Sequence, residues 1–252
     1  MSNLNIKLGI AVSQYGYLPL NVNLYQTCHW LICGGSGSGK STFLLYVMNQ
    51  LLETDLNIYL GDFKGSQDFI GLTPNYAEFN DIERLIEQFY TKYQEVKINK
   101  TGEHLLLIID EYAGFMVWLE EQDRKRASSI KNKLSEILML GRKLPNNGSA
   151  WFWCICQRCD STYFAHGSRD NYMLSVGFSH LSKESKTMLG IIADEIPDGY
   201  IPTTGKGLLS IDGKPLTVLQ VPQIDVERLR QLLKKKAAYR FGEAKSICNP
   251  LT

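Results

Sequence analysis

Apolar and polar positions along the chain follow two periods, one typical of strands and one typical of helices. Short apolar runs predict buried strands at residues 29–33, 56–62, 105–109 and 150–157. Apolar residues recur at helical spacing in residues 40–52, in residues 81–96 and in an amphipathic segment from about 118 to 140. Because the run at 105–109 is continuously apolar, as strands of parallel sheets are, we expect an α/β fold with a mostly parallel central sheet flanked by helices.

The two ends of the chain show different patterns. Short alternating pieces at residues 6–12 and 18–24 predict a small N-terminal β layer, residues 1–28, that leads into the central sheet. A short basic helix is expected at residues 226–236, in a tail of residues 226–252 that follows one domain of residues 1–225. This helix either binds nucleic acid or a partner helix, or is a solvated terminal helix.

Length and charge limit the class of protein. With 252 residues the chain can form one large domain with a sizeable core, and its net charge of +1 argues neither for nor against a polyanionic partner. The sequence contains no run of about 18 apolar residues, and its N-terminus lacks the features of a signal peptide. We therefore expect a cytoplasmic protein.

A glycine-rich stretch separates the first apolar strand from the first helix. It fits the template G-x-x-x-x-G-K-[ST] and consists of Gly34, Gly35, Ser36, Gly37, Ser38, Gly39, Lys40, Ser41 and Thr42. Its glycines allow successive backbone N–H groups to face a phosphate, and the following helix adds the positive end of its dipole. Lys40 would neutralise the β- and γ-phosphates of ATP, and Ser41 would hold Mg²⁺. The alternative, a flexible linker, does not explain the two flanking apolar segments.

Two acidic residues and an amide follow predicted strands. Asp110 and Glu111 stand directly after the apolar run 105–109. Asp110 would bind Mg²⁺ through water, and Glu111 would orient and deprotonate the attacking water. Gln157 ends the aromatic-rich strand 150–157, where its amide would touch the γ-phosphate or that water. With the glycine loop, these residues predict an ATP-hydrolysing site.

Three further groups of side chains leave two interpretations open. Asp62 and Lys64 follow the second predicted strand and either approach the nucleotide or a neighbouring subunit, or form a solvated turn. A basic cluster in the last amphipathic segment either contacts a DNA backbone or is a solvated helix face; it comprises Arg124, Lys125, Arg126, Lys131 and Lys133. Cys156 and Cys159 have the spacing of a zinc ligand pair, with Cys154 as a third sulfur. No second pair is present, so buried strand thiols are favoured over a metal site.

The order of these landmarks resembles that of the FtsK/SpoIIIE family of DNA-pumping ATPases, within the wider group of HerA and FtsK motors. Besides the two nucleotide motifs, the resemblance rests on residues 62–65, 140–142, 179–189 and 205–209. It implies a RecA-like P-loop NTPase fold, a homo-oligomeric ring that is usually hexameric, and ATP-driven movement along double-stranded DNA.

The resemblance also implies roles for single residues. In the wider group, an arginine just before the glutamine-ending strand reaches the neighbouring subunit's γ-phosphate, and Arg142 matches that position. The alternative is that Arg142 is a cation at a helix C-terminus. Many family members carry Ser-Arg where this chain has Ser185-Lys186, and lysine lacks the planar fork of arginine. We do not expect the family's membrane helices or its DNA-reading winged-helix domain. A motor without these parts is more typical of a plasmid, phage or conjugative element.

Three functions follow from these patterns. The first is an ATP-driven ring translocase of double-stranded DNA. The second is a viral genome-packaging or conjugative coupling ATPase, whose partner is a portal, a membrane channel or a relaxase-type protein. The third is a nucleotide-gated assembly or regulatory protein that binds ATP without moving DNA, and this protein would still perform its task after loss of Lys40.

Overall fold

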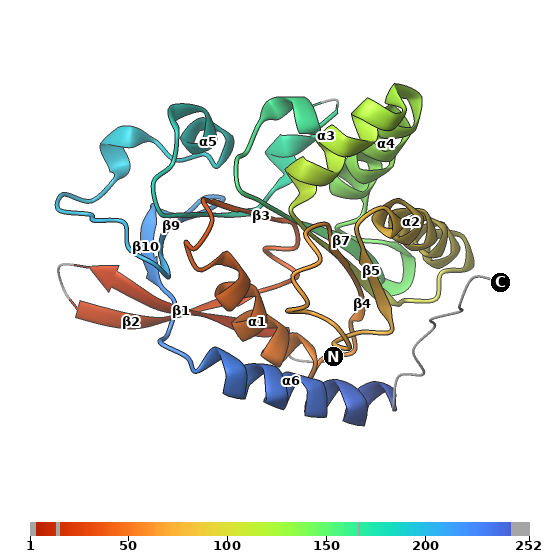
Figure 1. Ribbon diagram of the computed structural model, residues 1–252, viewed down its shortest axis with the longest axis horizontal. Coiled ribbons are helices and arrows are strands. Elements are labelled where there is room, and N and C mark those ends of the chain that lie inside the picture. Colours follow the sequence, from red (N-terminus) through yellow and green to blue (C-terminus); the bar gives the residue numbers. More distant parts are fainter. Residues whose placement is uncertain (1–3, 14–15, 166, 243–252) are drawn as a thin grey trace.

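Ten strands form a single sheet in the computed structural model, which describes residues 4–13, 16–165 and 167–242 (Figure 1). They are β1 (Asn5–Ser13), β2 (Gly16–Asn23), β3 (Trp30–Gly34), β4 (Asn57–Asp62), β5 (Asn75–Glu78), β6 (His104–Asp110), β7 (Ser149–Cys156), β8 (Leu174–Phe178), β9 (Lys206–Ile211) and β10 (Thr217–Gln220). Their order is β2-β1-β10-β9-β8-β3-β7-β6-β4-β5. The strands from β8 to β5 are parallel, and the others join antiparallel. The predicted α/β fold with a mostly parallel sheet is confirmed.

Helices cover both faces of this sheet. They are α1 (Lys40–Leu51), α2 (Asp81–Asn99), α3 (Tyr112–Gln122), α4 (Arg124–Leu140), α5 (Lys183–Met188) and α6 (Val226–Phe241). Short 3₁₀ turns lie at Pro145–Asn147, Ser161–Tyr163, Ser168–Asn171 and Ala193–Glu195. α1 and α6 pack on one face, and α2, α3 and α4 pack on the other (Figure 1). Because successive strand side chains point to opposite faces, Trp30 joins the first core and Leu31 joins the second.

The N-terminal strands extend the central sheet itself. β1 pairs with β2 on one side and with β10 on the other, where Ile10 lies opposite Gln220. The predicted N-terminal β segment that leads into the central sheet is therefore present, and β9 and β10 join it to β8. Among the described helices, none is long and apolar enough to cross a membrane.

The predicted tail helix is present as α6, and it packs against α1. Leu229, Leu233 and Ala237 are buried in the core on that side of the sheet. Arg230 forms an ion pair with Asp68. The helix is therefore amphipathic, with a packed face as well as a solvated one. Residues 243–252 of the predicted tail lie outside the described part of the chain.

The amphipathic segment predicted from about residue 118 to 140 is divided into two helices at Asp123. The Asp123 backbone is extended, with φ −159° and ψ 110°, and its carboxylate accepts hydrogen bonds from the N–H groups of Lys125 and Arg126. This is an N-cap, which satisfies two N–H groups that have no partner within α4. The apolar periodicity continues across the break, so periodicity alone did not reveal it.

A buried histidine links β3 to β7 at the edge of the sheet where these strands begin. The imidazole Nδ1 of His29 accepts a hydrogen bond of 3.1 Å from the Phe152 N–H, while Nε2 has no hydrogen-bond partner among the described residues. Burial, followed by the positive charge of Arg142, lowers the pKa of His29 from 6.5 to about 3. The folded protein therefore holds this imidazole neutral, with its proton on the buried Nε2.

Acid should destabilise the protein through His29. The pKa of His29 is lower in the folded than in the unfolded protein. Its contribution to the free energy of unfolding is therefore fully present above pH 6.5 and decreases as the pH falls toward 3. At 1.36 kcal/mol per pH unit, the loss at pH 4.5 is about 2.7 kcal/mol. His29→Asn keeps an acceptor for the Phe152 N–H and should remove this part of the pH dependence.

Urea unfolding at pH 7 and pH 4.5 measures the change in the free energy of unfolding between the two pH values. Exposed His180→Asn is the control and should show the same change as the parent. If His29→Asn also shows the same change as the parent, the assignment to His29 is contradicted.

Candidate nucleotide site

The glycine-rich loop joins the end of β3 to the start of α1. Gly37 and Gly39 have φ values of 73° and 102°, a region that side-chain-bearing residues rarely adopt, so the loop curls tightly before the helix begins. Lys40 is buried, and its ammonium donates hydrogen bonds of 2.5 Å to the Gly34 carbonyl and 3.1 Å to the Gly35 carbonyl. Ser41 occupies the first turn of α1. The lysine and the N-terminus of α1 thus lie together at the carboxyl end of β3, as the sequence predicts.

The turn before β9, which the sequence did not indicate as a neighbour of the glycine-rich loop, also contacts this loop. The Gly205 N–H donates to the Ser38 carbonyl at 2.9 Å, and the Thr204 hydroxyl donates to the Gly37 carbonyl at 3.3 Å. The contact is close, since a Cβ atom added to Gly39 would lie 2.9 Å from the Gly205 nitrogen. The turn before β9 therefore fixes the shape of the loop. The glycine pair in Gly205-Lys206-Gly207 was the available sequence signal.

Asp110 and Glu111 lie at the same edge of the sheet as the loop. Asp110 ends β6 and Glu111 follows it, and β7 lies between β6 and β3, so the carboxyl ends of three neighbouring parallel strands meet there. Burial and then the negative charges of Glu111 and Asp62 raise the pKa of Asp110 to about 7, while the positive charge of Lys40 lowers it. A buried carboxyl beside two other acids is a place where a cation would be stabilised.

Gln157 stands directly after β7 and contacts one of these acids. Its side-chain amide donates a hydrogen bond of 2.8 Å to Glu111 Oε1. Glu111 has a left-handed backbone conformation with φ 58°, which ends β6 and starts α3. The amide and the carboxylate are therefore already paired beside the loop, although 46 residues separate them in the sequence.

Asp62 does not lie in a solvated turn, which was one of the two interpretations of the sequence. Its carboxylate is fully buried and accepts hydrogen bonds from the backbone N–H groups of Lys64, Gly65 and Ser66, at 3.1, 3.1 and 2.8 Å. It also accepts a hydrogen bond from the Ser66 hydroxyl at 2.7 Å. Asp62 thus organises the turn after β4, and Lys64 is exposed on that turn. The Asp62 carboxylate is therefore not solvated, and its negative charge acts on Asp110, its register partner at the end of β6.

Arg142 lies at the opposite edge of the sheet from the loop. It is exposed in the turn between α4 and β7, and its charge acts on His29, which precedes β3. The eight residues of β7 separate this turn from Gln157, a span of roughly 25 Å. Among the described residues, no hydrogen bond or ion pair of the Arg142 guanidinium is present. Arg142 therefore does not reach the glycine loop of its own chain.

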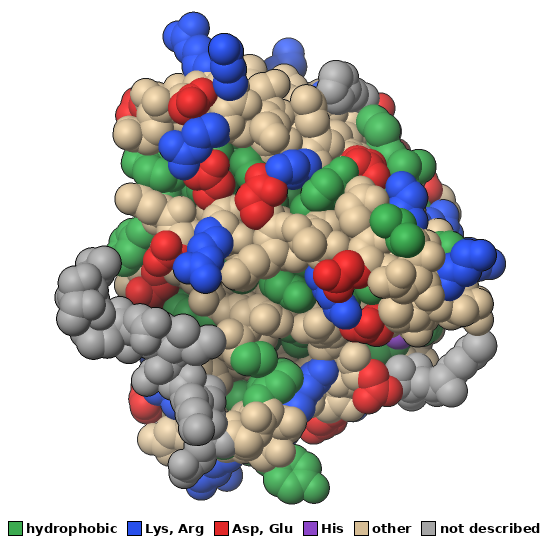
Figure 2. Space-filling view, turned by 90° about the vertical axis from the view of Figure 1, so that its right-hand side faces the viewer, with side chains coloured by type: hydrophobic (Ala, Val, Ile, Leu, Met, Phe, Trp, Pro, Cys, Tyr) green, Lys and Arg blue, Asp and Glu red, His purple; other side chains and the backbone are tan. Residues whose placement is uncertain are grey.

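The predicted basic cluster is largely paired with acids. Arg126 pairs with Glu83, Lys131 with Glu120 at 2.5 Å, and Lys133 with Glu87 at 2.5 Å. These ion pairs join α4 to α2 and α3, and Figure 2 shows basic and acidic side chains interspersed on the side of the molecule to the right in Figure 1. Arg124 and Lys125 are exposed and have no ion pair with a described residue. Of the five cations, these two are the ones available to a phosphate backbone.

The donor atoms at this edge suit a nucleotide with its magnesium ion. The buried hydroxyl of Ser38 has no hydrogen-bond partner among the described residues, and Lys40 is held by loop carbonyls alone. Hydroxyl and carboxylate oxygens are the ligands that Mg²⁺ prefers, and Ser41 and Asp110 offer them. The residues present therefore fit ATP and Mg²⁺.

The fold and the loop are those of P-loop NTPase domains. Within that class, the chain is similar to the FtsK domain-containing protein YdcQ of Bacillus subtilis strain 168, with 26% identity over 82% of this chain and 46% of that protein. This match confirms the resemblance to FtsK/SpoIIIE-type ATPases. The chain spans less than half the length of that relative. No protein-family model matches the chain.

Solved structures of ATPases share this fold. The conjugation coupling protein TcpA of pCW3, determined with ATPγS, has a TM-score of 0.70 and 18% identity, over 93% of this chain and 71% of TcpA. ATPases 2 and 3 of EssC from Geobacillus thermodenitrificans have a TM-score of 0.70 and 14% identity, over 94% and 49% of the two chains. The type VII secretion ATPase EccC of Thermomonospora curvata has a TM-score of 0.68 and 22% identity, over 99% and 33%.

Proposed function

We propose that this chain is an ATP-hydrolysing motor domain that moves double-stranded DNA as a ring of identical copies. The position of Arg142 carries the proposal, because this exposed guanidinium lies at the opposite edge of the sheet from its own glycine loop. A head-to-tail contact between copies brings opposite edges of neighbouring molecules together, and repetition of that contact closes a ring. Each phosphate site would then receive its arginine from the next copy.

The chemistry follows from the residues at the loop. Backbone N–H groups and Lys40 bind and orient the phosphates, and Ser41 and Asp110 would hold Mg²⁺, whose positive charge would offset that of the phosphates. Glu111, held by the Gln157 amide at 2.8 Å, orients a water molecule and accepts its proton. The neighbour's Arg142 stabilises the charge of the transition state.

Double-stranded DNA is the proposed track. The similarity to an FtsK domain-containing protein supports this choice, as does the fold shared with a conjugation coupling protein. A motor that moves along any sequence must hold phosphates rather than base edges. Arg124 and Lys125 on α4 are the candidate phosphate contacts, since Arg126, Lys131 and Lys133 are paired with acids.

ATPase assays with and without duplex DNA test this proposal. We expect duplex to stimulate hydrolysis and added salt to reduce the stimulation, because phosphate contacts release counterions. Replacing Arg124 and Lys125 together by alanine should raise the duplex concentration needed for half-maximal stimulation. The slope of the logarithm of the duplex affinity against log salt should decrease by about 2. Lys234→Ala with Lys235→Ala on exposed α6 is the matched control. A rate indifferent to duplex would contradict the DNA motor, and an effect of the α6 pair alone would move the contact to that helix.

The same domain could serve a coupling ATPase of a mobile element. Its partners would then be a membrane channel, a portal or a relaxase-type protein, and a cytoplasmic ring would be recruited to a membrane or to a DNA-processing complex. One experiment distinguishes the motor from a nucleotide-gated assembly protein. The assembly protein would still perform its task after Lys40→Ala. The motor requires Lys40 for every turnover.

A further inference from the structure

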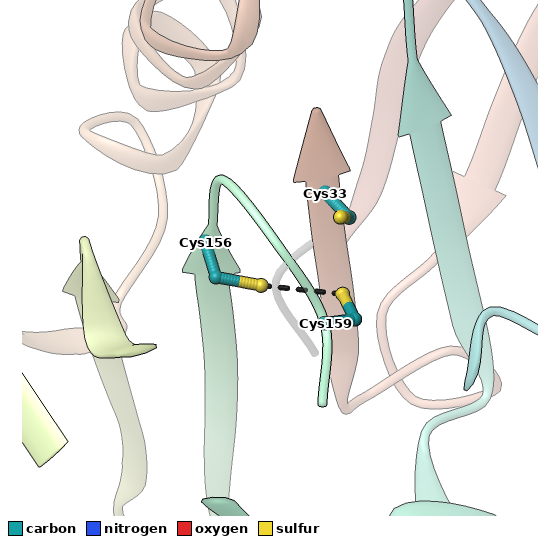
Figure 3. Close-up of side chains that lie close together, drawn as sticks. All are labelled: Cys33, Cys156 and Cys159. Atoms are coloured by element: carbon teal, nitrogen blue, oxygen red, sulfur yellow. Dashed lines mark hydrogen bonds between the residues drawn. The ribbon is translucent and has the colours of Figure 1, made fainter. Parts of the chain in front are cut away.

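Three cysteine side chains converge beside the nucleotide site. The sulfur atoms of Cys33, Cys156 and Cys159 all lie within 4.8 Å of one another, and all three residues are buried (Figure 3). The Cys156 and Cys159 sulfurs are 3.2 Å apart. The sequence offered Cys154 as a third sulfur and favoured buried strand thiols over a metal site; the group within this distance instead contains Cys33, which is 123 residues before Cys156.

The sheet explains why Cys33 joins the pair. Cys33 is in the last part of β3 and Cys156 ends β7, and the two are register partners on adjacent parallel strands. Partners in register point to the same face, so both thiols enter the core that α2, α3 and α4 cover. The turn after β7 then brings Cys159 back to the same place, and the spacing Cys-x-x-Cys is what a shared metal ion requires.

The distances between the thiols are close to those of a metal site. In a site with metal–sulfur bonds of about 2.3 Å, neighbouring sulfurs are roughly 3.8 Å apart. One pair of sulfurs here is 3.2 Å apart and no pair exceeds 4.8 Å, so small side-chain shifts would bring all three to that spacing. Oxygen atoms are also close: the Gln157 carbonyl accepts from the Cys33 thiol at 3.6 Å, and the Ser185 hydroxyl lies beside Cys33.

We propose that Cys33, Cys156 and Cys159 bind one thiophilic closed-shell metal ion, Zn²⁺ or Cu⁺. Thiolate sulfur is the ligand that both ions prefer, and a trithiolate site serves Cu⁺ alone or Zn²⁺ with one further donor. Binding exchanges three S–H bonds for three metal–sulfur bonds and releases three protons, so it requires no oxidant or reductant.

The bound ion ties two parts of the nucleotide site together. Cys33 immediately precedes Gly34 of the glycine loop, and Cys156 immediately precedes Gln157, whose amide holds Glu111. An ion shared by these cysteines would fix the end of β3 relative to the end of β7. This metal site is independent of the proposed movement of DNA, because it is inferred from the convergence of the three thiols alone.

Metal titration of the full chain tests the proposal. The parent carries Cys248→Ser, since Cys248 lies outside the described residues and could bind metal separately. Co²⁺ is added first as a probe, because thiolate coordination gives an intense charge-transfer absorption in the near ultraviolet, and Zn²⁺ then displaces it. Cu⁺ is measured in competition with a Cu⁺-selective chelator. We expect one ion per chain, bound through the three thiolates.

Single replacements separate the site from general thiol binding. Cys33→Ser, Cys156→Ser and Cys159→Ser should each weaken binding by at least about 100-fold and reduce the charge-transfer absorption. Cys28→Ser is the control, since this buried cysteine contacts Met173 and lies outside the cluster. Metal should also raise the unfolding temperature of the parent and of Cys28→Ser, but not that of Cys159→Ser, which alters a loop residue. Unchanged affinity in Cys159→Ser, or no uptake of either ion by reduced, folded parent protein, would overturn the proposal.

Discussion

Glu111→Gln is expected to slow ATP hydrolysis by about 10²–10⁴-fold while nucleotide binding is retained. The amide oxygen of the new side chain can still accept the hydrogen bond that Gln157 donates at 2.8 Å, so the geometry beside the glycine loop is kept. What is lost is the group that accepts a proton from water. Steady-state phosphate release and the affinity for a fluorescent ATP analogue, measured on the same preparation, separate the two effects.

Glu121→Gln is the matched control. Glu121 is an exposed acid near the end of α3, so this substitution makes the same chemical change away from the loop. Its hydrolysis rate should equal that of the parent. A Glu111→Gln protein that hydrolyses ATP at the parental rate would show that another group accepts the proton. Equal loss of binding and hydrolysis would show instead that Glu111 positions the nucleotide.

The parts of this site that are local in sequence could be predicted from it. The glycine loop, Lys40 and Ser41 depend on a short motif whose conformation requires glycine at fixed places. Asp110 and Glu111 were found because a buried parallel strand is apolar throughout, which makes its polar end conspicuous. Gln157 was found for the same reason, since β7 is buried along its whole length.

What depends on pairing between distant segments could not be predicted. The third sulfur of the thiol cluster comes from the register of β3 with β7, which no local spacing encodes. The hydrogen bonds from Thr204 and Gly205 to the loop depend on the path of the chain before β9. Periodicity shows that a helix has a polar face but not which acids lie opposite it, so the pairing of Lys131 and Lys133 was not predicted.

The proposed assembly into a ring depends on the position of the Arg142 side chain. An exposed cation near a helix C-terminus satisfies the helix dipole, and this was the alternative explanation of the residue. In the described part of the chain the Arg142 guanidinium makes no hydrogen bond to the last carbonyls of α4. No hydrogen bond within the described part of the fold would be lost with this guanidinium, so its removal should affect an assembled active site more than stability.

Arg142→Ala is expected to reduce the rate of hydrolysis by about 10³–10⁵-fold, the effect of removing an arginine that contacts the transferred phosphate in the transition state. Because Arg142 is exposed, the unfolding temperature should stay close to that of the parent. ATPase rates at high protein concentration, with calorimetry on the same samples, measure both quantities. Lys143→Ala, which removes an adjacent exposed charge, is the control and should retain activity.

Mixing two inactive variants decides whether this arginine acts between copies. Lys40→Ala lacks the loop lysine but keeps Arg142, whereas Arg142→Ala keeps the lysine. In a mixed ring, the loop of an Arg142→Ala copy next to a Lys40→Ala copy has both groups, so the mixture should hydrolyse ATP faster than either variant alone. If Arg142 acts within its own chain, every site in the mixture lacks either the loop lysine or the arginine. If Arg142 serves only the dipole of α4, no site needs the arginine of a neighbouring copy. The mixed rate would then equal the sum of the separate rates, which would contradict the shared site.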